Sequence, residues 1–337
     1  MAAALSNPDH AIPSVIGLCG KDRIGFSDLA LALNVKKMAQ EIKQGEAIRE
    51  TLANACKRSG TPLFTEEKTM SVSSEPAILL DVADHVGWIT LNRPAAYNAI
   101  NTELAERLLD AVIRCDEDDG IRAVVITGKG PSFCAGGDIR QMMDAAGADG
   151  HAGAFLKTLT VSLHETIATI AHTSKPVIMA INGTAAGAGF SLALAGDLVL
   201  AAENARFTVA YTAIGLAPDG SSTFTLPRLI GAKRAYELMY TNRAMSANEA
   251  KELGLVNQVF PAAQFIQHVR EYTARVAEGP TVALGYAKKL LTLSAHNSLE
   301  TQMEHERRAI AACGRTADFR EGAGAFFAKR PAKFQGR

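Results

Sequence analysis

The chain has 337 residues, of which 47% are hydrophobic and 21% are charged, as is usual for a globular protein with a sizeable core. Thirty-five Lys and Arg residues balance 35 Asp and Glu residues, so no net field attracts nucleic acid or an anionic membrane. We therefore expect neither nucleic acid nor a membrane as a partner.

The five cysteines are scattered, with no CxxC pair and no Cys/His cluster at metal-ligand spacing. Residues 1–18 lack the basic start and apolar run of a secretory signal. No apolar stretch reaches the ~20 residues that a membrane-spanning helix needs. These observations predict reduced thiols, no metal site and a cytoplasmic location.

Three regions are expected from the composition and hydrophobic pattern along the sequence. Residues 1–75 form an extension that is partly helical or disordered and to which no chemistry can be assigned. Residues 76–270 form the core, and residues 271–337 form a C-terminal helical region. The expected fold class of the core is α/β.

The core begins with a predicted hairpin of strands 78–82 and 86–91, with Asp84 and His85 at its turn. Helices are expected over 103–116 and 155–171, and buried strands over 123–127, 177–181 and 198–201. Strand, glycine-rich turn and helix recur, which predicts stacked ββα turns. After Ser221 the chain is expected to be almost wholly helical, with helices over 232–240, 247–253, 263–278, 282–293 and 298–312.

Residues 133–139, FCAGGDI, form the first glycine-rich loop. Gly136 and Gly137 permit backbone conformations closed to larger residues, and small side chains allow a ligand to approach the amides. Amides that precede a helix point outward and attract negative charge. Asp138 is expected to cap this helix.

The second loop, residues 182–189, NGTAAGAG, also follows a predicted strand and opens a helix. A single loop of this kind usually serves only close packing. Two of them on neighbouring strands can direct two N–H groups at one carbonyl oxygen, which is the geometry of an oxyanion hole. Neither GxGxxG after the first strand nor GxxxxGK[ST] occurs, so no dinucleotide or P-loop site is predicted.

Together with Phe207 and residues 215–220, GLAPDG, these loops resemble the crotonase (enoyl-CoA hydratase/isomerase) family. The resemblance extends from about Ile78 to the C-terminus. It implies a crotonase-like spiral of ββα units, a C-terminal helical trimerisation region and a homotrimer or hexamer. It also implies a coenzyme A thioester as substrate, with no permanently bound cofactor.

By motif position, the resemblance implies that the amides of Gly137 and Ala188 hold the thioester carbonyl. Residues expected along the coenzyme A channel are Ala135, Gly136, Asp138 and Ile139. Arg93 and Lys329 are candidates for the phosphates, Lys329 across a subunit boundary, although solvated charges are the alternative. The expected pocket walls are Ile139, Met142, Phe190 and Leu216.

Hydratases of this family carry two glutamates, where this chain has Ser191 and Tyr211, neither of which can do carboxylate chemistry. Asp219 matches the single acid or base of isomerase branches, although Pro-Asp-Gly is also a common turn sequence. Ser191 is not expected to be a nucleophile, because Ala193 replaces the glycine of a nucleophile elbow. His164 and His172 lie on a helical pattern and are expected at the surface or in the core.

The expected function is an acyl-CoA isomerase with Asp219 as proton shuttle. It would shift a double bond from Δ3 to Δ2, or isomerise a ring epoxide of an arylacetyl-CoA, which the C-terminal DxREGxxxFxAKR motif favours by resemblance. One alternative is an enoyl-CoA hydratase of the same fold. The other is a non-catalytic acyl-CoA-binding or scaffold protein whose residues 1–75 recruit a partner.

Overall fold

The computed structural model describes residues 75–147 and 150–337. The predicted N-terminal extension therefore lies almost entirely outside the described residues. Among the helices that the structure describes, none has the length and apolar character to cross a bilayer.

The larger sheet has six strands in the order β1-β2-β3-β5-β7-β10. Strands β1 and β2 are an antiparallel hairpin, and the other neighbours are parallel. The hairpin turn is where it was predicted, and Asp84 and His85 both have positive φ, as a tight two-residue turn requires. The strands are Ile78–Ala83, Val86–Leu91, Ala123–Gly128, Val177–Ile181, Leu198–Ala202 and Gln258–Phe260.

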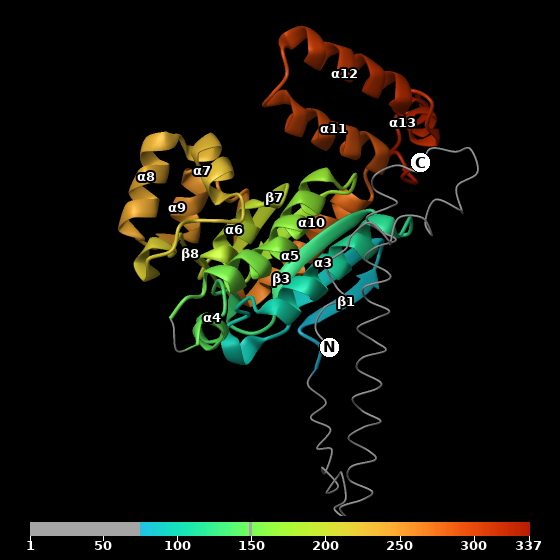
Figure 1. Cartoon of the computed structure of the whole chain (residues 1–337). Helices are drawn as coiled ribbons and strands as arrows, with labels where there is room; N and C mark the ends of the chain where they lie inside the picture. The colour runs from blue at the N-terminus through green and yellow to red at the C-terminus, as the bar shows by residue number, and fades with distance from the viewer. Residues whose placement is uncertain (1–74, 148–149) are drawn as a thin grey trace, which may run out of the picture. The chain divides into compact units, whose positions relative to one another are not determined.

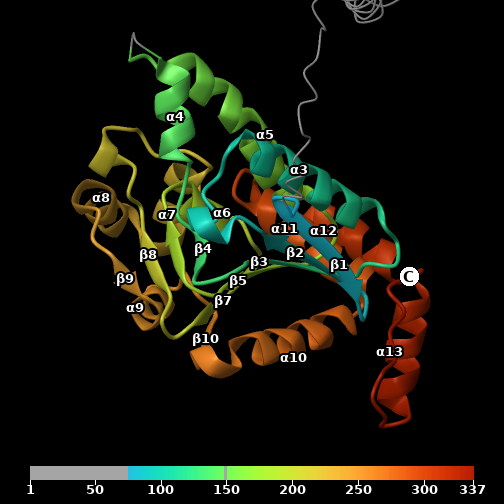
Figure 2. The same cartoon turned by 90° about the horizontal axis from the view of Figure 1, so that it is seen from below.

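Helices cover both faces of this sheet, which explains why its central strands are apolar without alternation. Val124 and Ile126 belong to the core cluster shared with α3 (Thr102–Glu117) and α5 (Gly153–His172). Ala123 and Val125 point the other way and pack with Val269 of α10 (Phe265–Ala277). Figure 2 shows α10 on one side of the sheet and α3 and α5 on the other.

A smaller sheet has four strands in the order β4-β6-β8-β9, namely Ser132–Cys134, Thr184–Ala186, Arg206–Thr208 and Met245–Ser246. The chain places β3, β5 and β7 in the larger sheet and follows each with β4, β6 or β8 in the smaller one. Helices α4 (Ile139–Ala146) and α5 follow β4, and α6 (Ala188–Leu194) follows β6 (Figure 1). The predicted spiral of ββα turns is thereby confirmed.

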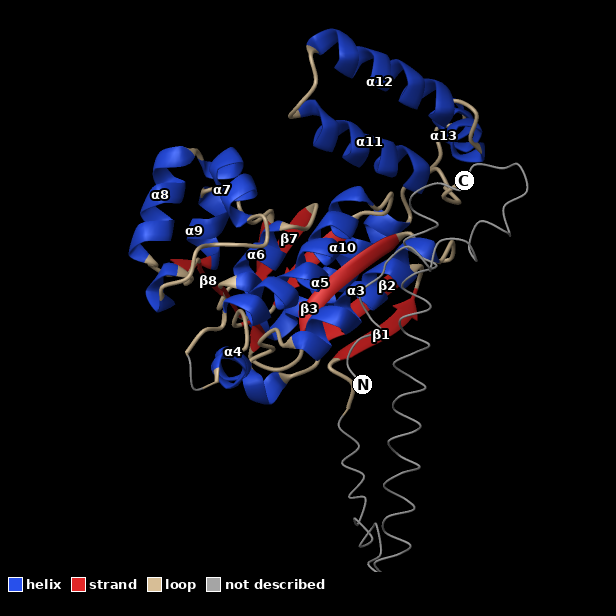
Figure 3. Ribbon diagram, viewed as in Figure 1, coloured by secondary structure: helices blue, strands red, loops and turns tan. Residues whose placement is uncertain are grey.

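The C-terminal part is almost wholly helical, as expected, although two short strands that were not predicted lie among its helices. The strands β9 and β10 interrupt the helices by pairing with β8 and β7. They are too short to show a two-residue periodicity, so only their pairing identifies them. Besides α10, the helices of this part, coloured in Figure 3, are α7 (Ser222–Ile230), α8 (Ala232–Thr241), α9 (Ala247–Glu252), α11 (Thr281–Ser294), α12 (Leu299–Cys313) and α13 (Ala317–Phe327).

Arg122 fixes the last residues of the chain beside the sheet. Its guanidinium donates to the hydroxyl of Thr281 at 3.0 Å, to the carbonyl of Gly279 at 2.6 Å and to that of Phe334 at 3.2 Å. The buried carboxylate of Asp318 accepts from the amides of Gln335 and Gly336. Arg122 and Asp318, the first residue of the tail motif, thus hold residues 334–336 in place.

Glycine at position 189 allows α6 to pack directly on β4. A Cβ added there would lie 2.1 Å from the carbonyl oxygen of Cys134 and 2.7 Å from its Cβ. Relieving this clash would require α6 to move away from β4, a strand of the smaller sheet, or β4 itself to move. This close approach brings the first turn of α6 beside the loop that follows β4.

Replacing Gly189 with Ala should therefore destabilise the fold by about 1–3 kcal/mol, the usual cost of overpacking a core. Gly153→Ala is the matched control, because nothing lies within 4 Å of a Cβ at that helical position. The control should stay within about 1 kcal/mol of the parent. Urea unfolding of the three proteins measures both changes, and equal midpoints for Gly189→Ala and the parent would contradict the packing argument.

Candidate active site

Three turns meet at the carboxyl edge of the smaller sheet. They follow β4, β6 and β8, which are parallel neighbours, so their ends lie side by side. The amide of Gly187 donates to the carbonyl of Thr208 at 3.1 Å, which ties the second turn to the third. Open sheets commonly bind ligands at the carboxyl ends of parallel strands.

The first two turns are in contact through their glycines. Gly136 has a φ of 107°, and a Cβ there would lie 3.0 Å from the carbonyl oxygen of Ala186 and 3.6 Å from the amide nitrogen of Ala188. Gly187 has a φ of 52° and packs against the Cα of Gly136. The positive φ favours glycine at both positions, and at Gly136 the close carbonyl of Ala186 also leaves little space for a side chain.

Several amides in these turns, those of Gly136, Gly137 and Ala188 among them, have no acceptor within the described part of the chain. The neighbouring amides of Ala135, Asp138 and Gly187 all donate to backbone carbonyls. The N–H groups of Gly137 and Ala188 have no such partner, and both residues line the same cavity. Their N–H groups are thus available to a ligand in that cavity.

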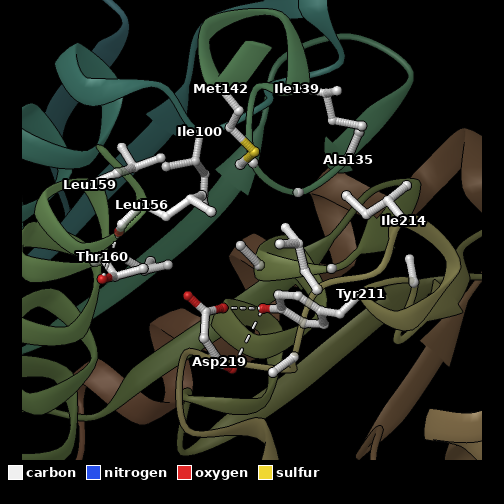
Figure 4. Close-up of a pocket in the computed structure, with 18 of the residues that line it drawn as sticks. Ile100, Ala135, Ile139, Met142, Leu156, Leu159, Thr160, Tyr211, Ile214 and Asp219 are labelled. Carbon is white, nitrogen blue, oxygen red and sulfur yellow. Dashed lines mark hydrogen bonds between the residues drawn. The ribbon is translucent and has the colours of Figure 1, made fainter. Parts of the chain in front are cut away.

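The cavity has a volume of about 470 Å³ and mostly apolar walls. Helix α5 forms one wall with Leu156, Leu159, Thr160 and Leu163, and α4 contributes Met142. Figure 4 shows Asp219 and Tyr211 together, with Met142, Ile139 and Ala135 across the cavity from Asp219. Of the predicted site residues, those that line this cavity are Ala135, Gly136, Gly137, Ile139, Ala188 and Asp219.

Asp219 is held by a hydrogen-bonded cluster of three residues. The phenol of Tyr211 donates to Oδ1 of Asp219 at 2.5 Å and contacts the hydroxyl of Ser191 at 2.8 Å. The Ser191 hydroxyl donates to the carbonyl oxygen of Asp219 at 2.8 Å. The two residues at the positions of the hydratase glutamates thus both hold Asp219. Tyr211 bonds its carboxylate, as Figure 4 shows, and Ser191 bonds its backbone carbonyl.

The loop that carries this cluster holds unusual backbone conformations. Ala210 and Ser221 have φ values of 61° and 64°, in the left-handed region that non-glycine residues rarely adopt. Such conformations cost about 1–3 kcal/mol each and concentrate at functional sites. Ala210 directly precedes Tyr211, and Ser221 lies two residues after Asp219.

Burial and the neighbouring carboxylate of Asp219 both raise the pKa of Tyr211 far above its ordinary value. Only 8% of Tyr211 is exposed, and Ser191 is completely buried. The phenol therefore stays protonated and acts as a hydrogen-bond donor to Asp219.

His164 completes the surroundings of Asp219. Its Nε2 lies 3.6 Å from Oδ2 of Asp219, and it accepts a hydrogen bond from the amide of Gly220 at 3.3 Å. His164 is exposed at the surface, which is one of the two locations expected for it, and it also lines the cavity. The available signal was its helical spacing with Leu156, Leu159, Thr160 and Leu163, which places it on the cavity-facing side of α5.

Three candidates for the coenzyme A channel lie outside the set that lines the cavity. Asp138 caps α4 by accepting from the amide of Gln141, as predicted, and it pairs with Arg93 at 2.9 Å. Burial alone would raise the pKa of Asp138, but the hydrogen bonds from Arg93 and Gln141 hold it below its ordinary value. Lys329 is exposed just after α13. A role for these three residues toward phosphates stays a prediction.

Phe190 is not part of the cavity wall, contrary to the prediction. Ile139, Met142 and Leu216 line the cavity as predicted, whereas Phe190 is completely buried in the main core cluster. Helix α6 is buried on every side, so its second and third residues face the core while Ala188 alone reaches the cavity. Sequence periodicity cannot assign the faces of so short a helix.

Residues 81–337 match the family described as enoyl-CoA hydratase/isomerase. The chain is 38% identical over 261 residues to 1,2-epoxyphenylacetyl-CoA isomerase of Escherichia coli (strain K12), covering 77% of this chain and 98% of that enzyme. It is 37% identical over 246 residues to 4-chlorobenzoyl coenzyme A dehalogenase-2 of Arthrobacter sp, covering 73% and 88%. Among solved structures, an enoyl-CoA hydratase from Polaromonas sp. JS666 superposes with a TM-score of 0.73 at 33% identity, covering 77% of this chain and 99% of that one.

The raised pKa of Tyr211 predicts a difference in alkaline titration. Between about pH 8 and pH 11, which spans the ordinary tyrosine pKa of about 10, the folded parent and Tyr211→Phe should release the same number of phenolic protons. In denaturant the parent should release one more, because its unfolded Tyr211 titrates normally. The stability that Tyr211 contributes is therefore present below about pH 10 and lost as pH rises above it. Phenolate absorbance measures both states, and an extra ionisation in the folded parent would contradict the assignment.

Proposed function

The chain belongs to the enoyl-CoA hydratase/isomerase family, and on that premise we propose that it is an acyl-CoA isomerase with Asp219 as its proton carrier. It would shift a double bond from the Δ3 to the Δ2 position of an enoyl-CoA, or isomerise a ring epoxide of an arylacetyl-CoA. The second possibility draws on the similarity to 1,2-epoxyphenylacetyl-CoA isomerase. Coenzyme A enters as part of the substrate.

The proposal depends most on one observation. A single apolar cavity contains two unpartnered amides, those of Gly137 and Ala188, and one hydrogen-bonded carboxylate, that of Asp219. The amides are donors for a thioester oxygen, and the carboxylate is a base for the adjacent carbons. Ser191 and Tyr211 supply no second carboxylate.

The chemistry follows from these groups. A proton on C2 of a 3-enoyl thioester is too weakly acidic for a free carboxylate to remove. When Asp219 takes it, the C–H electron pair forms a C1–C2 double bond and the carbonyl electrons move to oxygen. Donation by Gly137 and Ala188 stabilises that oxyanion, and losing one such donor typically costs about 3–4 kcal/mol.

One carboxylate is enough because nothing is added or lost. Asp219 returns a proton to C4, the carbonyl re-forms, and the double bond lies between C2 and C3. Tyr211 holds Oδ1 of Asp219 throughout, which leaves Oδ2 as the oxygen that exchanges the proton. Ser191 and Tyr211 are thus positioning residues in this scheme.

Substrate binding is proposed along the first glycine turn. Ala135, Gly136 and Ile139 line the cavity and lie where the pantetheine arm would approach the amides. Arg93 and Lys329 are proposed phosphate contacts, Lys329 toward a neighbouring subunit. Arg93 would have to share its guanidinium with Asp138, which it already contacts.

A homotrimer or hexamer is proposed as the assembly. The C-terminal helices expose large apolar side chains that a lone chain would leave in water, including Leu291, Ile310, Phe326 and Phe327. Exposed apolar patches of this kind commonly mark protein interfaces. Sedimentation or light scattering of the purified protein tests this assembly.

One observation favours a hydratase as the second candidate. His164 gives the cavity a second group that can carry a proton, 3.6 Å from Asp219, and together they could activate water. Incubation with a 2-enoyl-CoA alone distinguishes the two functions. A 3-hydroxyacyl product supports the hydratase and contradicts the isomerase.

Asp219→Asn should lower turnover of a 3-enoyl-CoA by about 10²–10⁴-fold, the usual contribution of a positioned acid or base. The amide keeps the size of the side chain and an oxygen for the Tyr211 bond, so the loss would report the proton transfer. Asp110→Asn, at an exposed position on α3, is the control and should match the parent. Formation of 2-enoyl-CoA followed by mass spectrometry measures the rate, and unchanged turnover in Asp219→Asn would exclude Asp219 as the proton carrier.

A further inference from the structure

His164 lies between two cavities. It lines the proposed substrate cavity and also a second cavity of about 430 Å³, which lies farther along α5 toward its C-terminal end. The second cavity is bordered by small residues such as Ala168, Ala171 and Ala195, and by Thr225. About half of the His164 side chain is exposed.

The hydrogen bond from Gly220 defines which nitrogen of His164 is free to accept a proton. Because the Gly220 N–H points at Nε2, that nitrogen presents a lone pair and Nδ1 carries the hydrogen of the neutral ring. The same Nε2 lies 3.6 Å from Oδ2 of Asp219. A small rotation of either side chain brings these two atoms within hydrogen-bond distance.

The other contacts of Asp219 are closed to water. Oδ1 is occupied by the phenol of Tyr211, which is 8% exposed, and the Ser191 hydroxyl is completely buried. Asp219 itself is reached through the substrate cavity, which a bound thioester would fill. With substrate in place, His164 is the group beside Asp219 that still borders a second, open space.

We infer that His164 is a proton exit, which exchanges the proton on Asp219 with water in the second cavity during turnover. This inference rests on the proposed isomerase function. After Asp219 takes a proton from C2, its Oδ2–H bond breaks and a bond to Nε2 of His164 forms, which restores the carboxylate. The resulting imidazolium has no lone pair for the Gly220 N–H, so that hydrogen bond is lost and the ring is released toward the second cavity.

The rest of the step balances without any further reactant. The Nε2–H bond breaks as water in the second cavity takes the proton, and a solvent proton replaces it. That proton returns through Nε2 to Asp219 and is delivered to C4. The product therefore carries a solvent hydrogen at C4, whereas direct transfer by Asp219 alone would move the substrate's own hydrogen from C2 to C4.

The test uses the full-length protein and 3-hexenoyl-CoA that carries deuterium at both C2 positions, in ordinary water. The 2-hexenoyl-CoA product keeps one deuteron at C2, and mass spectrometry shows whether the second was retained at C4 or lost. The parent should give mainly singly labelled product. In His164→Gln the ratio of doubly to singly labelled product should rise about tenfold or more, since an amide oxygen can accept from Gly220 but the amide cannot take up and release a proton.

His172→Gln is the matched control, because His172 is exposed on the same helix and lines neither cavity. It should give the same labelling as the parent. The ratio is taken per product molecule, so it does not depend on how much product a variant forms, and His164→Asn provides a second variant with the same expected change. Labelling in both His164 variants that equals the parent's, or doubly labelled product from the parent itself, overturns the proton exit. Absence of any 2-enoyl product from the parent would overturn the proposed function, and this inference with it.

Discussion

The parallel pairing of β4, β6 and β8 places three turns from distant parts of the chain at one edge of a small sheet. Glycines then set how closely the first two turns approach. A side chain at Gly136 would press on the carbonyl of Ala186, and one at Gly189 would collide with the carbonyl of Cys134. Because neither glycine can be enlarged without separating the turns, the positions of the Gly137 and Ala188 amides are consequences of packing. The chemistry of the cavity depends on that contact.

The third turn has a strained backbone on both sides of the segment that carries Tyr211 and Asp219. Ala210 and Ser221 adopt left-handed conformations, and the carbonyl of Asp219 accepts hydrogen bonds from the hydroxyls of Ser191 and Ser222. These bonds leave Asp219 little freedom of orientation. Ser191 and Tyr211 thus stand where hydratases have two glutamates, and their hydroxyl groups hydrogen-bond the single acid, Asp219.

Much of the fold and part of the site could be predicted from sequence because the signals were local. The hairpin turn, the buried strands and the cap at Asp138 each depend on a few neighbouring residues. The strands β9 and β10 were missed because their pairing with distant strands, and no local pattern, defines them. The position of His164 beside Asp219 was not predicted for a related reason, because it depends on how α5 is rotated against the turn that carries Asp219. Phe190 was misplaced because α6 is buried all round, so spacing could not tell core from cavity.

The central claim is that the amides of Gly137 and Ala188 polarise one thioester oxygen. The most direct measurement is the infrared carbonyl stretch of a saturated acyl-CoA, labelled with ¹³C at the thioester carbon, free and bound to the protein. Two donors on one oxygen weaken the C=O bond, so the account predicts a clear shift to lower frequency on binding. A bound thioester whose carbonyl frequency equals that of the free ligand would contradict the account.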